Sequence, residues 1–160
     1  IYLGLRFEWK FAIGAVLAQL HDVIITAGIF SLMHWPFDLN VLAALLAILG
    51  YSVNDTVVVY DRIRENFRKL PAVTPRDVID TSINQTLART MVTSFTTLLS
   101  VIALALFGGT ILTGFSTAMI IGIVFGTYSS IFVASAIVDH MGVKHEDLMP
   151  RAQRPIDDLP

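Results

Sequence analysis

The chain has 160 residues, of which 54% are hydrophobic and 15% are charged, and its formal net charge is −2. Soluble globular chains contain about 25% charged residues, and a slightly acidic chain without a basic surplus is not expected to bind nucleic acid. It contains no cysteine, which excludes a disulfide framework, a thiolate zinc site and a cysteine nucleophile. It begins with Ile1 without a signal-peptide pattern, so we expect further protein upstream.

The charges are grouped in blocks instead of being spread along the chain. Residues 11–60 contain three carboxylates and neither Lys nor Arg, and residues 87–138 contain a single charge, that of Arg89. All other charges lie in residues 1–10, 61–86 and 139–160. Long uncharged stretches that alternate with charged connectors are typical of a multi-pass membrane protein.

Four apolar stretches are long enough to cross a bilayer, which takes about 20 helical residues. The predicted membrane helices cover residues 11–33, 39–60, 86–107 and 112–138. Very short connectors with Pro36 and the Gly108-Gly109 pair join the first helix to the second and the third to the fourth. The sequence therefore predicts an all-α fold, a polytopic bundle of antiparallel helical hairpins.

Three further segments are predicted outside these spans. Residues 1–10 are expected to contain the end of a preceding membrane helix and a cytoplasmic turn. In the central loop, residues 61–70 continue the second helix, and Thr74-Pro75 is typical of a helix start. We expect a short interfacial helix from there to about Gln85. Residues 141–160 lose hydrophobicity, contain three prolines and are predicted to form a disordered tail.

The basic residues predict the orientation. Lys and Arg precede the first membrane helix, lie between the second and the third, and follow the fourth, whereas both hairpin turns contain none. Since cytoplasmic loops carry the excess of Lys and Arg, the central loop and both ends of the chain are expected in the cytoplasm. Four crossings return the chain to its starting side, in agreement with this charge distribution.

Asp55 is the clearest candidate for a functional residue. It lies about 8 Å inside the cytoplasmic end of the second helix, at about 1.5 Å per residue, which is too deep for its short side chain to reach the interface. Carboxylates inside a membrane are costly and usually mark an ion or proton pathway. The alternative is a structural hydrogen bond between helices, with Ser52 and Asn54 helping to satisfy the carboxylate.

Arg89 lies near the cytoplasmic start of the third helix, which runs opposite to the helix of Asp55. By itself it could equally anchor the helix to lipid headgroups. Two polar rows at helical spacing extend from this region, Arg89-Thr93-Thr96-Ser100 and Thr86-Thr90-Thr93-Thr97-Ser100. They indicate a helix that faces protein or a hydrated cavity, although simple packing of hydroxyls between helices is an equal alternative.

An Asp and an Arg so placed form a pair with switchable protonation. A nearby guanidinium favours the charged form of a carboxyl group, and apolar surroundings favour its neutral form. Asp55 could thus take up a proton on one side of the membrane and release it on the other. Such a relay uses protons as the coupling ion and needs no metal or organic cofactor.

Other residues are weaker candidates. Asp22, which follows His21 near the middle of the first helix, is either a relay group or a structural hydrogen-bonding group. Gly122 and Gly126 form a small-xxx-small motif that indicates a helix contact without identifying the partner. Enzyme motifs such as a P-loop, HExxH or GxSxG are absent from the sequence, and neither Asp22 nor Asp55 lies in a GxGD context, so no enzyme is expected.

Three segments closely resemble the SecF family, whose members are subunits of the bacterial SecD–SecF protein-export complex. They are residues 50–66 (GYSVNDTVVVYDRIREN), 84–94 (NQTLARTMVTS) and 126–131 (GTYSSI). The HDVIIT stretch at 21–26 and the Gly108-Gly109 turn also fit, and the similarity extends over residues 5–149. Within the second helix, Val53-Asn54-Asp55 and Tyr60-Asp61-Arg62 favour SecF over the related SecD.

The resemblance implies a member of the resistance–nodulation–division superfamily in the bacterial inner membrane. Such a subunit uses the proton-motive force to help pull preproteins from the SecYEG channel, with SecD as partner. Asp55 and Arg89 match the family positions that take part in proton passage, together with an Asp that SecD supplies. The family has six membrane helices and a periplasmic domain that contacts the preprotein. This chain would hold the last four helices, without that domain.

Two other functions remain open from the residues. A proton-coupled efflux transporter for small solutes or drugs would need a substrate cavity within one chain and a complete repeat, for which four helices are few. A purely structural scaffold of the translocase would leave Asp55 dispensable.

Overall fold

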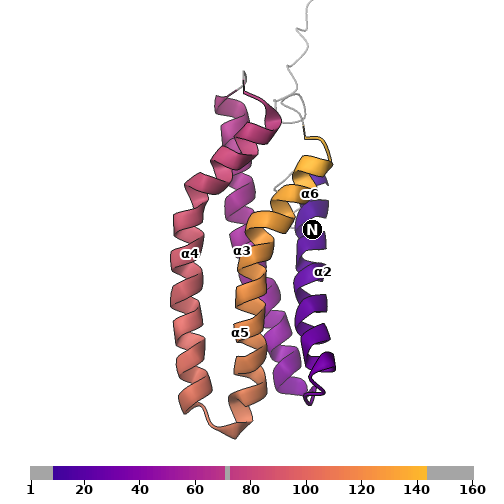
Figure 1. Cartoon of the computed structure of the whole chain (residues 1–160), viewed down its shortest axis with the longest axis vertical. Coiled ribbons are helices and arrows are strands. Elements are labelled where there is room, and N and C mark those ends of the chain that lie inside the picture. The colour runs from indigo at the N-terminus through magenta and orange to yellow at the C-terminus, as the bar shows by residue number, and fades with distance from the viewer. Residues whose placement is uncertain (1–8, 71–72, 144–160) are drawn as a thin grey trace, which may run out of the picture.

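The computed structural model describes residues 9–70 and 73–143, which form helices and no strand (Figure 1). The elements in chain order are α2 (Trp9–Leu32), α3 (Leu39–Lys69), α4 (Pro75–Phe107), the 3₁₀-helix η1 (Thr110–Leu112), α5 (Thr113–Tyr128), the π-helix η2 (Ser129–Val133) and α6 (Ala134–His140). Four helical stretches are long and apolar enough to cross a membrane, the last of them from Thr110 to His140. The predicted all-α bundle of four membrane helices is confirmed.

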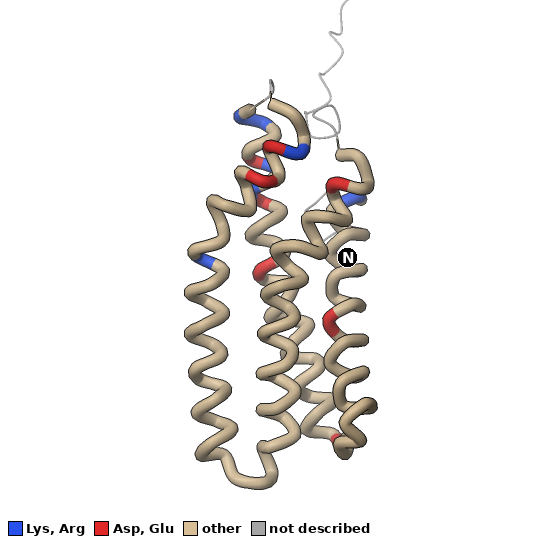
Figure 2. The backbone as a smooth tube through the Cα atoms, in the orientation of Figure 1, with Lys and Arg blue, Asp and Glu red and all other residues tan. Residues whose placement is uncertain are grey.

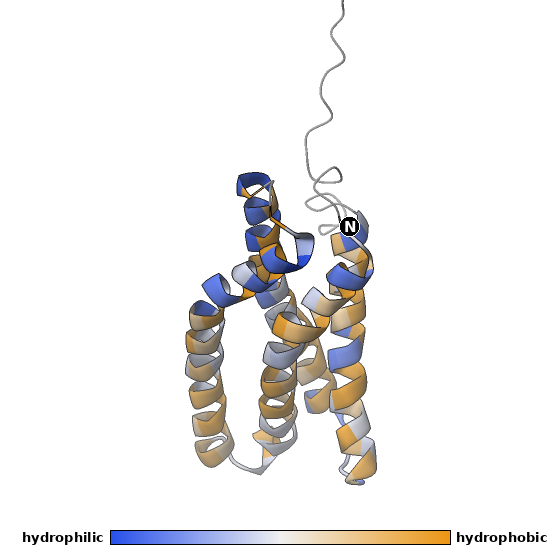
Figure 3. Cartoon of the chain, turned by 45° about the horizontal axis from the view of Figure 1, so that its top comes forward, coloured by the Kyte–Doolittle hydropathy of each residue, from blue (hydrophilic) through white to orange (hydrophobic). Residues whose placement is uncertain are grey.

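The two ends of the bundle differ in charge. Figure 2 shows most Lys, Arg, Asp and Glu residues at the end where α3 ends and α4 begins, far from the turn that joins α4 to α5. We call these the charged end and the hairpin end. The helices between them are mainly hydrophobic (Figure 3). With 31 and 33 residues, α3 and α4 are about 46 and 50 Å long. Both therefore extend beyond a hydrocarbon core of about 30 Å.

The predicted interfacial helix is wrong as a separate element, because residues 75–85 are the first turns of α4. Its predicted start is confirmed, since Thr74 Oγ1 accepts a hydrogen bond from the backbone N of Asp77 at 3.3 Å and Pro75 is the first helical residue. Residues 76–107 contain neither Gly nor Pro, so nothing in this segment ends the helix where it enters the membrane. In Figure 1 the first turns run obliquely before α4 continues along the bundle.

The other predicted boundaries lie within a few residues of the observed ones. Asp38 caps α3, because its Oδ1 accepts a hydrogen bond from the backbone N of Val41 at 2.9 Å. Gly109 closes the α4–α5 turn at a φ of 72°, a conformation that a side chain disfavours. Trp9 and Lys10 belong to α2 and not to the predicted turn before it. The expected end of a preceding helix and the expected tail from residue 144 onward lie outside the described residues.

The fourth predicted helix, 112–138, contains an unexpected change of geometry. Between α5 and α6, five residues form the π-helix η2, which ends with the backbone N of Ala134 donating to the oxygen of Ser129, five residues earlier. A π-turn inserted into an α-helix is rare and is frequently found at functional sites. The extra residue in this turn shifts the faces of α6 relative to those of α5.

Two apolar clusters form the core, one toward each end of the bundle. Members of the cluster nearer the charged end include Phe11, Tyr60, Ile63, Phe67 and Val138. Members of the cluster nearer the hairpin end include Phe30, Val41, Ile48, Ala118 and Ile123. Buried polar residues separate the two clusters along every membrane span, namely Asp22, Thr26, Ser52, Asp55, Thr56, Thr86, Thr90, Ser94, Ser129 and Ser130. We call this set the polar layer.

Gly122 provides a test of the packing between α5 and α3. A methyl group at this position would collide with the side chain of Ile48, which is fully buried, whereas one at Gly28 would meet nothing within 4 Å. We expect Gly122→Ala to lower the free energy of unfolding by about 1–3 kcal/mol through overpacking. Gly28→Ala should not be destabilising, because alanine favours a helix over glycine. Thermal unfolding of the purified protein in detergent measures both, and equal midpoints would contradict the close α3–α5 contact.

Candidate functional site

Asp55 lies in the polar layer on α3 and has only 3% of its surface exposed. Its Oδ2 atom is buried and has no hydrogen-bond partner among the described residues. Since an unsatisfied polar group in an apolar medium costs several kcal/mol, burying this carboxyl group is energetically costly. Asp55 is thus buried within the bundle, but Ser52, which was expected to help satisfy it, bonds to Asp22 instead.

Arg89 lies on α4, which packs beside α3, and its side chain is exposed at the surface of the bundle. It interacts electrostatically with Asp55 without forming an ion pair. The two residues that the sequence singled out are therefore near neighbours that do not touch. This arrangement leaves Asp55 sensitive to the distance between α3 and α4.

The structure adds a hydroxyl network that the sequence analysis did not identify. Tyr51 Oη donates to Ser94 Oγ at 2.8 Å, and Ser94 Oγ lies 2.7 Å from Thr127 Oγ1. The three residues come from α3, α4 and α5, so the network joins the three helices at one level. Tyr51 precedes Asp55 by four residues, and this spacing places both side chains on the same face of α3. The four-residue spacing of Tyr51 and Asp55 is the feature of the sequence from which this network could have been predicted.

Asp22 is fully buried and joins α2 to α3. Ser52 Oγ donates to its Oδ2 at 2.5 Å, and His21 Nδ1 lies 3.2 Å from its Oδ1. A side chain at Gly126 would reach this pair, because its Cβ would lie 3.6 Å from Asp22 Oδ2. Ser52, which the sequence analysis associated with Asp55, is thus the partner of Asp22. Ser52 therefore lies on the face of α3 that packs against α2 and not on the face toward α4.

The two glycines of the predicted helix-packing motif face the interior of the chain. Gly122 lies against Ile48 and Gly126 against Ser52, both on α3. The predicted helix contact is therefore made within the chain, by α5 with α3. Small residues at these positions let the two backbones approach closely, as is typical of membrane helices.

The hydroxyl rows of α4 divide between two faces. Thr86, Thr90 and Ser94 are buried against the bundle, whereas Arg89, Thr93, Thr96 and Ser100 are exposed on the outer face. The exposed hydroxyls bond to carbonyl oxygens of their own helix, for example that of Thr96 to Val92 at 2.8 Å. One polar row thus faces inward and the other, which carries Arg89, faces away from the described chain.

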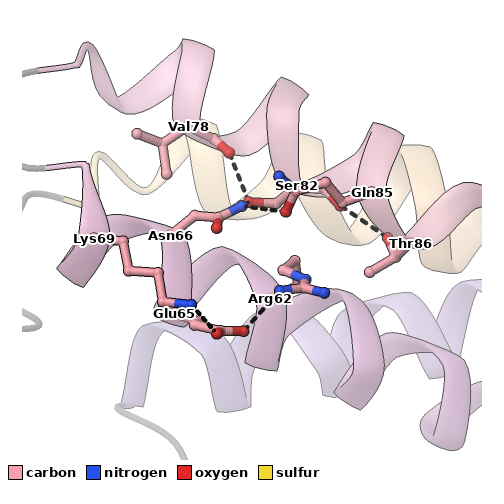
Figure 4. Close-up of polar contacts among 8 residues, drawn as sticks. All are labelled: Arg62, Glu65, Asn66, Lys69, Val78, Ser82, Gln85 and Thr86. Carbon is pink, nitrogen blue, oxygen red and sulfur yellow. Dashed lines mark hydrogen bonds and ion pairs between the residues drawn. The ribbon is translucent and has the colours of Figure 1, made fainter.

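Outside the apolar part of the bundle, a side-chain amide joins α3 to α4. Asn66 Nδ2 donates to Ser82 Oγ at 2.8 Å and to Gln85 Oε1 at 2.9 Å (Figure 4). Next to it on α3, Glu65 accepts hydrogen bonds from Arg62 and Lys69. Because Asn66 is buried, its bonds hold the two helices together beyond the level of Asp55 and Arg89.

The contact between Asp22 and Ser52 can be tested by stability. Ser52→Ala removes a hydrogen bond from a fully buried carboxyl group, so we expect it to lower the free energy of unfolding by about 1–3 kcal/mol. Ser100→Ala is the matched control, because this exposed hydroxyl bonds only to its own helix and its loss should cost less than about 0.5 kcal/mol. Thermal unfolding in detergent measures both changes. Equal effects would mean that the hydrogen bond between Ser52 and Asp22 does not stabilise the fold.

Comparison with known proteins identifies the family to which the chain is similar. The family model described as "Protein export membrane protein SecD/SecF, C-terminal" matches residues 1–144. The chain is 55% identical over 150 residues to the protein translocase subunit SecF of Vibrio alginolyticus, a match that covers 94% of this chain and 48% of that protein. It is 50% identical over 161 residues to the SecF subunit of Haemophilus influenzae, covering all of this chain and 50% of that protein.

The fold has a close counterpart among solved structures. The crystal structure of SecDF, a translocon-associated membrane protein from Thermus thermophilus, matches with a TM-score of 0.84 and 48% sequence identity. The match covers 88% of this chain and 20% of that chain. This chain spans about half the length of the curated relatives it matches. By its sequence and its helical arrangement, the chain belongs to the SecD/SecF family of protein export membrane proteins.

Proposed function

We propose that this chain is the membrane part of a SecF-type translocase subunit that uses the proton-motive force to promote export of preproteins across the bacterial inner membrane. Asp55 is the group that binds and releases the proton. The observation that carries the proposal is its buried, unpartnered carboxyl oxygen, with the guanidinium of Arg89 in electrostatic range. It acts as a transport subunit and not as an enzyme, with protons as coupling ion and without a metal or organic cofactor.

The mechanism rests on the competition between desolvation and charge. Apolar surroundings favour a neutral carboxyl group and a nearby guanidinium favours a carboxylate. A movement that brings Arg89 closer to Asp55 therefore promotes release of the proton, and a movement apart promotes its uptake. One proton that crosses 100 mV provides about 2.3 kcal/mol, enough to change such an equilibrium roughly 50-fold at about 1.4 kcal/mol per factor of ten.

The hinge for this movement is the link between α3 and α4. Asn66 ties the two helices near the charged end, and the hydroxyl network of Tyr51, Ser94 and Thr127 ties them on the other side of Asp55. Asp55 and Arg89 lie between these two ties. Small bending of α4 between them changes the Asp55–Arg89 distance without separating the helices.

Asp22 has a different role in this proposal. Its Oδ2 atom accepts a hydrogen bond from Ser52, and its Oδ1 atom lies 3.2 Å from His21 Nδ1. The bond from Ser52 positions α2 against α3. A direct relay role for Asp22 would require this contact to open during each cycle. We therefore place it second to Asp55 as a proton-binding group.

We further propose that the charged end faces the cytoplasm and the hairpin end the periplasm, following the distribution of Lys and Arg. The partners would be a SecD-like subunit, the SecYEG translocon and the preprotein, the last through a periplasmic domain of the full-length subunit. The outer row of α4 supports the SecD contact. Exposing Arg89 and the three hydroxyl residues of that face to lipid would cost free energy, since membrane helices direct charged groups to protein or water.

The alternatives lack a supporting observation in the structure. An efflux transporter would need a substrate cavity enclosed by this chain, whereas the largest of the described pockets, about 820 Å³, is an apolar groove between the outer surfaces of α2 and α6. A scaffold would have no need to keep an unpartnered carboxyl group in the membrane. Export driven by the proton-motive force is the function that uses Asp55.

The proposal predicts that Asp55→Asn abolishes export driven by the proton-motive force while the complex still assembles. Asn has nearly the same size and cannot titrate. Asp38→Asn is the matched control, because it makes the same substitution at the exposed N-cap of the same helix. Asn caps a helix about as well as Asp, so this variant should keep its structure. The measurement is preprotein export by inverted vesicles that contain the full-length complex, with and without a proton gradient.

Arg89 variants extend this test. If its charge acts on Asp55, Arg89→Lys should retain more gradient-dependent export than Arg89→Ala, although Lys lacks the forked geometry. Normal gradient-dependent export by a well-assembled Asp55→Asn complex would contradict the mechanism and favour the scaffold.

The orientation is tested by cysteine labelling. Single cysteines at Trp35 and Thr110, both exposed at the hairpin end, should react with an impermeant thiol reagent added to intact spheroplasts. Cysteines at Lys69 and Arg76, exposed at the charged end, should react only after permeabilisation. The opposite pattern would reverse the proposed orientation. The present chain adds no background, because it contains no cysteine.

A further inference from the structure

Most buried hydroxyl groups in this bundle have a hydrogen-bond partner. Ser82, Thr86 and Thr26, for example, donate to a carbonyl oxygen one turn earlier in their own helix. Among the described residues, four buried side-chain oxygens have no partner, namely Asp55 Oδ2, Thr56 Oγ1, Thr90 Oγ1 and Ser135 Oγ. Because no lipid group can satisfy such oxygens, they indicate positions where water is bound.

The unpartnered oxygens lie on one side of the Tyr51–Ser94–Thr127 network. Each of these three residues marks the same level on its helix, because their hydroxyl groups are in contact. Four residues further toward the charged end, about 6 Å at 1.5 Å per residue, stand Asp55 on α3, Thr90 on α4 and Ile131 on η2. Ser135 follows Ile131 by another four residues. The sites therefore form a series that leads from Asp55 toward the charged end.

A pocket begins where this series ends. It has a volume of about 190 Å³ and lies between the start of α4 and the η2–α6 segment. Arg76 and Asp80 line it from α4, and Ile131, Ser135 and Asp139 line it from the opposite side. Ser135 lines the pocket although it is only 3% exposed, and its hydroxyl has no partner among the described residues. Since a water molecule takes up about 30 Å³ of liquid volume, there is room for several.

We propose that this pocket is the water-filled mouth of a proton path that connects the charged end to Asp55. Waters held by Ser135 and Thr90 would continue from the pocket to the carboxyl group, past the buried side chain of Ile131, which lines the pocket. Protonated Asp55 transfers its proton to the nearest water, which leaves a carboxylate and a hydronium ion. The proton then passes between waters to the bulk solvent.

The pocket on the other side of α4 is a less suitable path. Its volume is about 350 Å³, and Asp61, Arg62, Glu65, Gln85 and Arg89 are among the residues that line it. None of the four unpartnered oxygens belongs to a residue that lines this second pocket. Two guanidinium groups face two carboxylates there, whereas in the first pocket two carboxylates, Asp80 and Asp139, face one guanidinium. A hydronium ion is therefore better stabilised in the first pocket.

The direction of proton movement rests on the proposed function, but the hydration of the pocket does not. We therefore test hydration first, by labelling single cysteines in the full-length complex in inverted vesicles, in a background without other reactive cysteines. Ser135→Cys should react with a small, impermeant, cationic thiol reagent about tenfold faster than Val16→Cys, since only a hydrated thiol ionises to the reactive thiolate. Val16 is the control, because it is half exposed on the outer face of α2 and lines neither pocket.

Equal labelling rates at the two positions, or labelling of Ser135→Cys from the hairpin side, would overturn the proposal. The same rates should be found in an Asp55→Asn background, because the shape of the pocket does not depend on that charge. Rapid labelling of Ser135→Cys in the Asp55→Asn background, together with normal export by Asp55→Asn, would contradict the proposed function and still support a hydrated pocket.

The path itself is tested by filling the pocket. Ser135→Leu should lower proton flux through the reconstituted complex about tenfold by displacing water. Val16→Leu is the control, because it adds bulk on the outer face of α2 and lines neither pocket, so it should lower the flux less than about twofold. Unchanged flux in an assembled Ser135→Leu complex would show that protons take another route. Where Ser135→Leu fails to assemble, the labelling of Ser135→Cys still decides whether the pocket is hydrated.

Discussion

The structure depends on how a layer of polar side chains is satisfied in the middle of an apolar bundle. Two hydrophobic clusters lie on either side of this layer, and most hydroxyls within it have a hydrogen-bond partner on their own helix or on a neighbouring one. Asp22 is paired through Ser52. Asp55 is the carboxyl group of the layer that retains an unpartnered oxygen. Among the described residues, the layer therefore contains one carboxyl group that is bonded to a neighbouring helix and one that retains an unpartnered oxygen.

α3 is the element on which these contacts converge. One of its faces carries Ile48 and Ser52 and contacts α2 and α5, and another carries Tyr51 and Asp55 and faces α4. Gly122 and Gly126 allow α5 to approach α3 closely, so α3 is held on several sides at the level of the polar layer. α4 is held less tightly, because its outer face is largely exposed. The movement proposed above is therefore one of α4, the helix that carries Arg89.

The π-helix η2 has a place in the same arrangement. Without it, α5 and α6 would be one regular helix whose buried face continues in register. The extra residue in the turn lets Ser129 and Ser130 face the polar layer while Ser135 faces the pocket near the charged end. Tyr60 Oη donates to the carbonyl oxygen of Ala134 at 3.0 Å, directly after this turn. A change of geometry within one helix thereby serves two polar regions at different depths.

The amino-acid sequence by itself determined the class of the protein, its four spans and the start of α4 at Thr74-Pro75, and it singled out Asp55 and Arg89 as candidate residues. These follow from local properties, because hydropathy, capping residues and a charge within an apolar run are readable without knowing what packs on what. Only the tertiary structure decided that Ser52 serves Asp22, that Gly122 and Gly126 face α3, that Tyr51 and Thr127 meet at Ser94, and that Asn66 joins α3 to α4. Each of these contacts joins residues distant in the chain, and the rotation of each helix about its own axis selects the partner. Hydropathy barely constrains that rotation when all faces of a membrane helix are apolar.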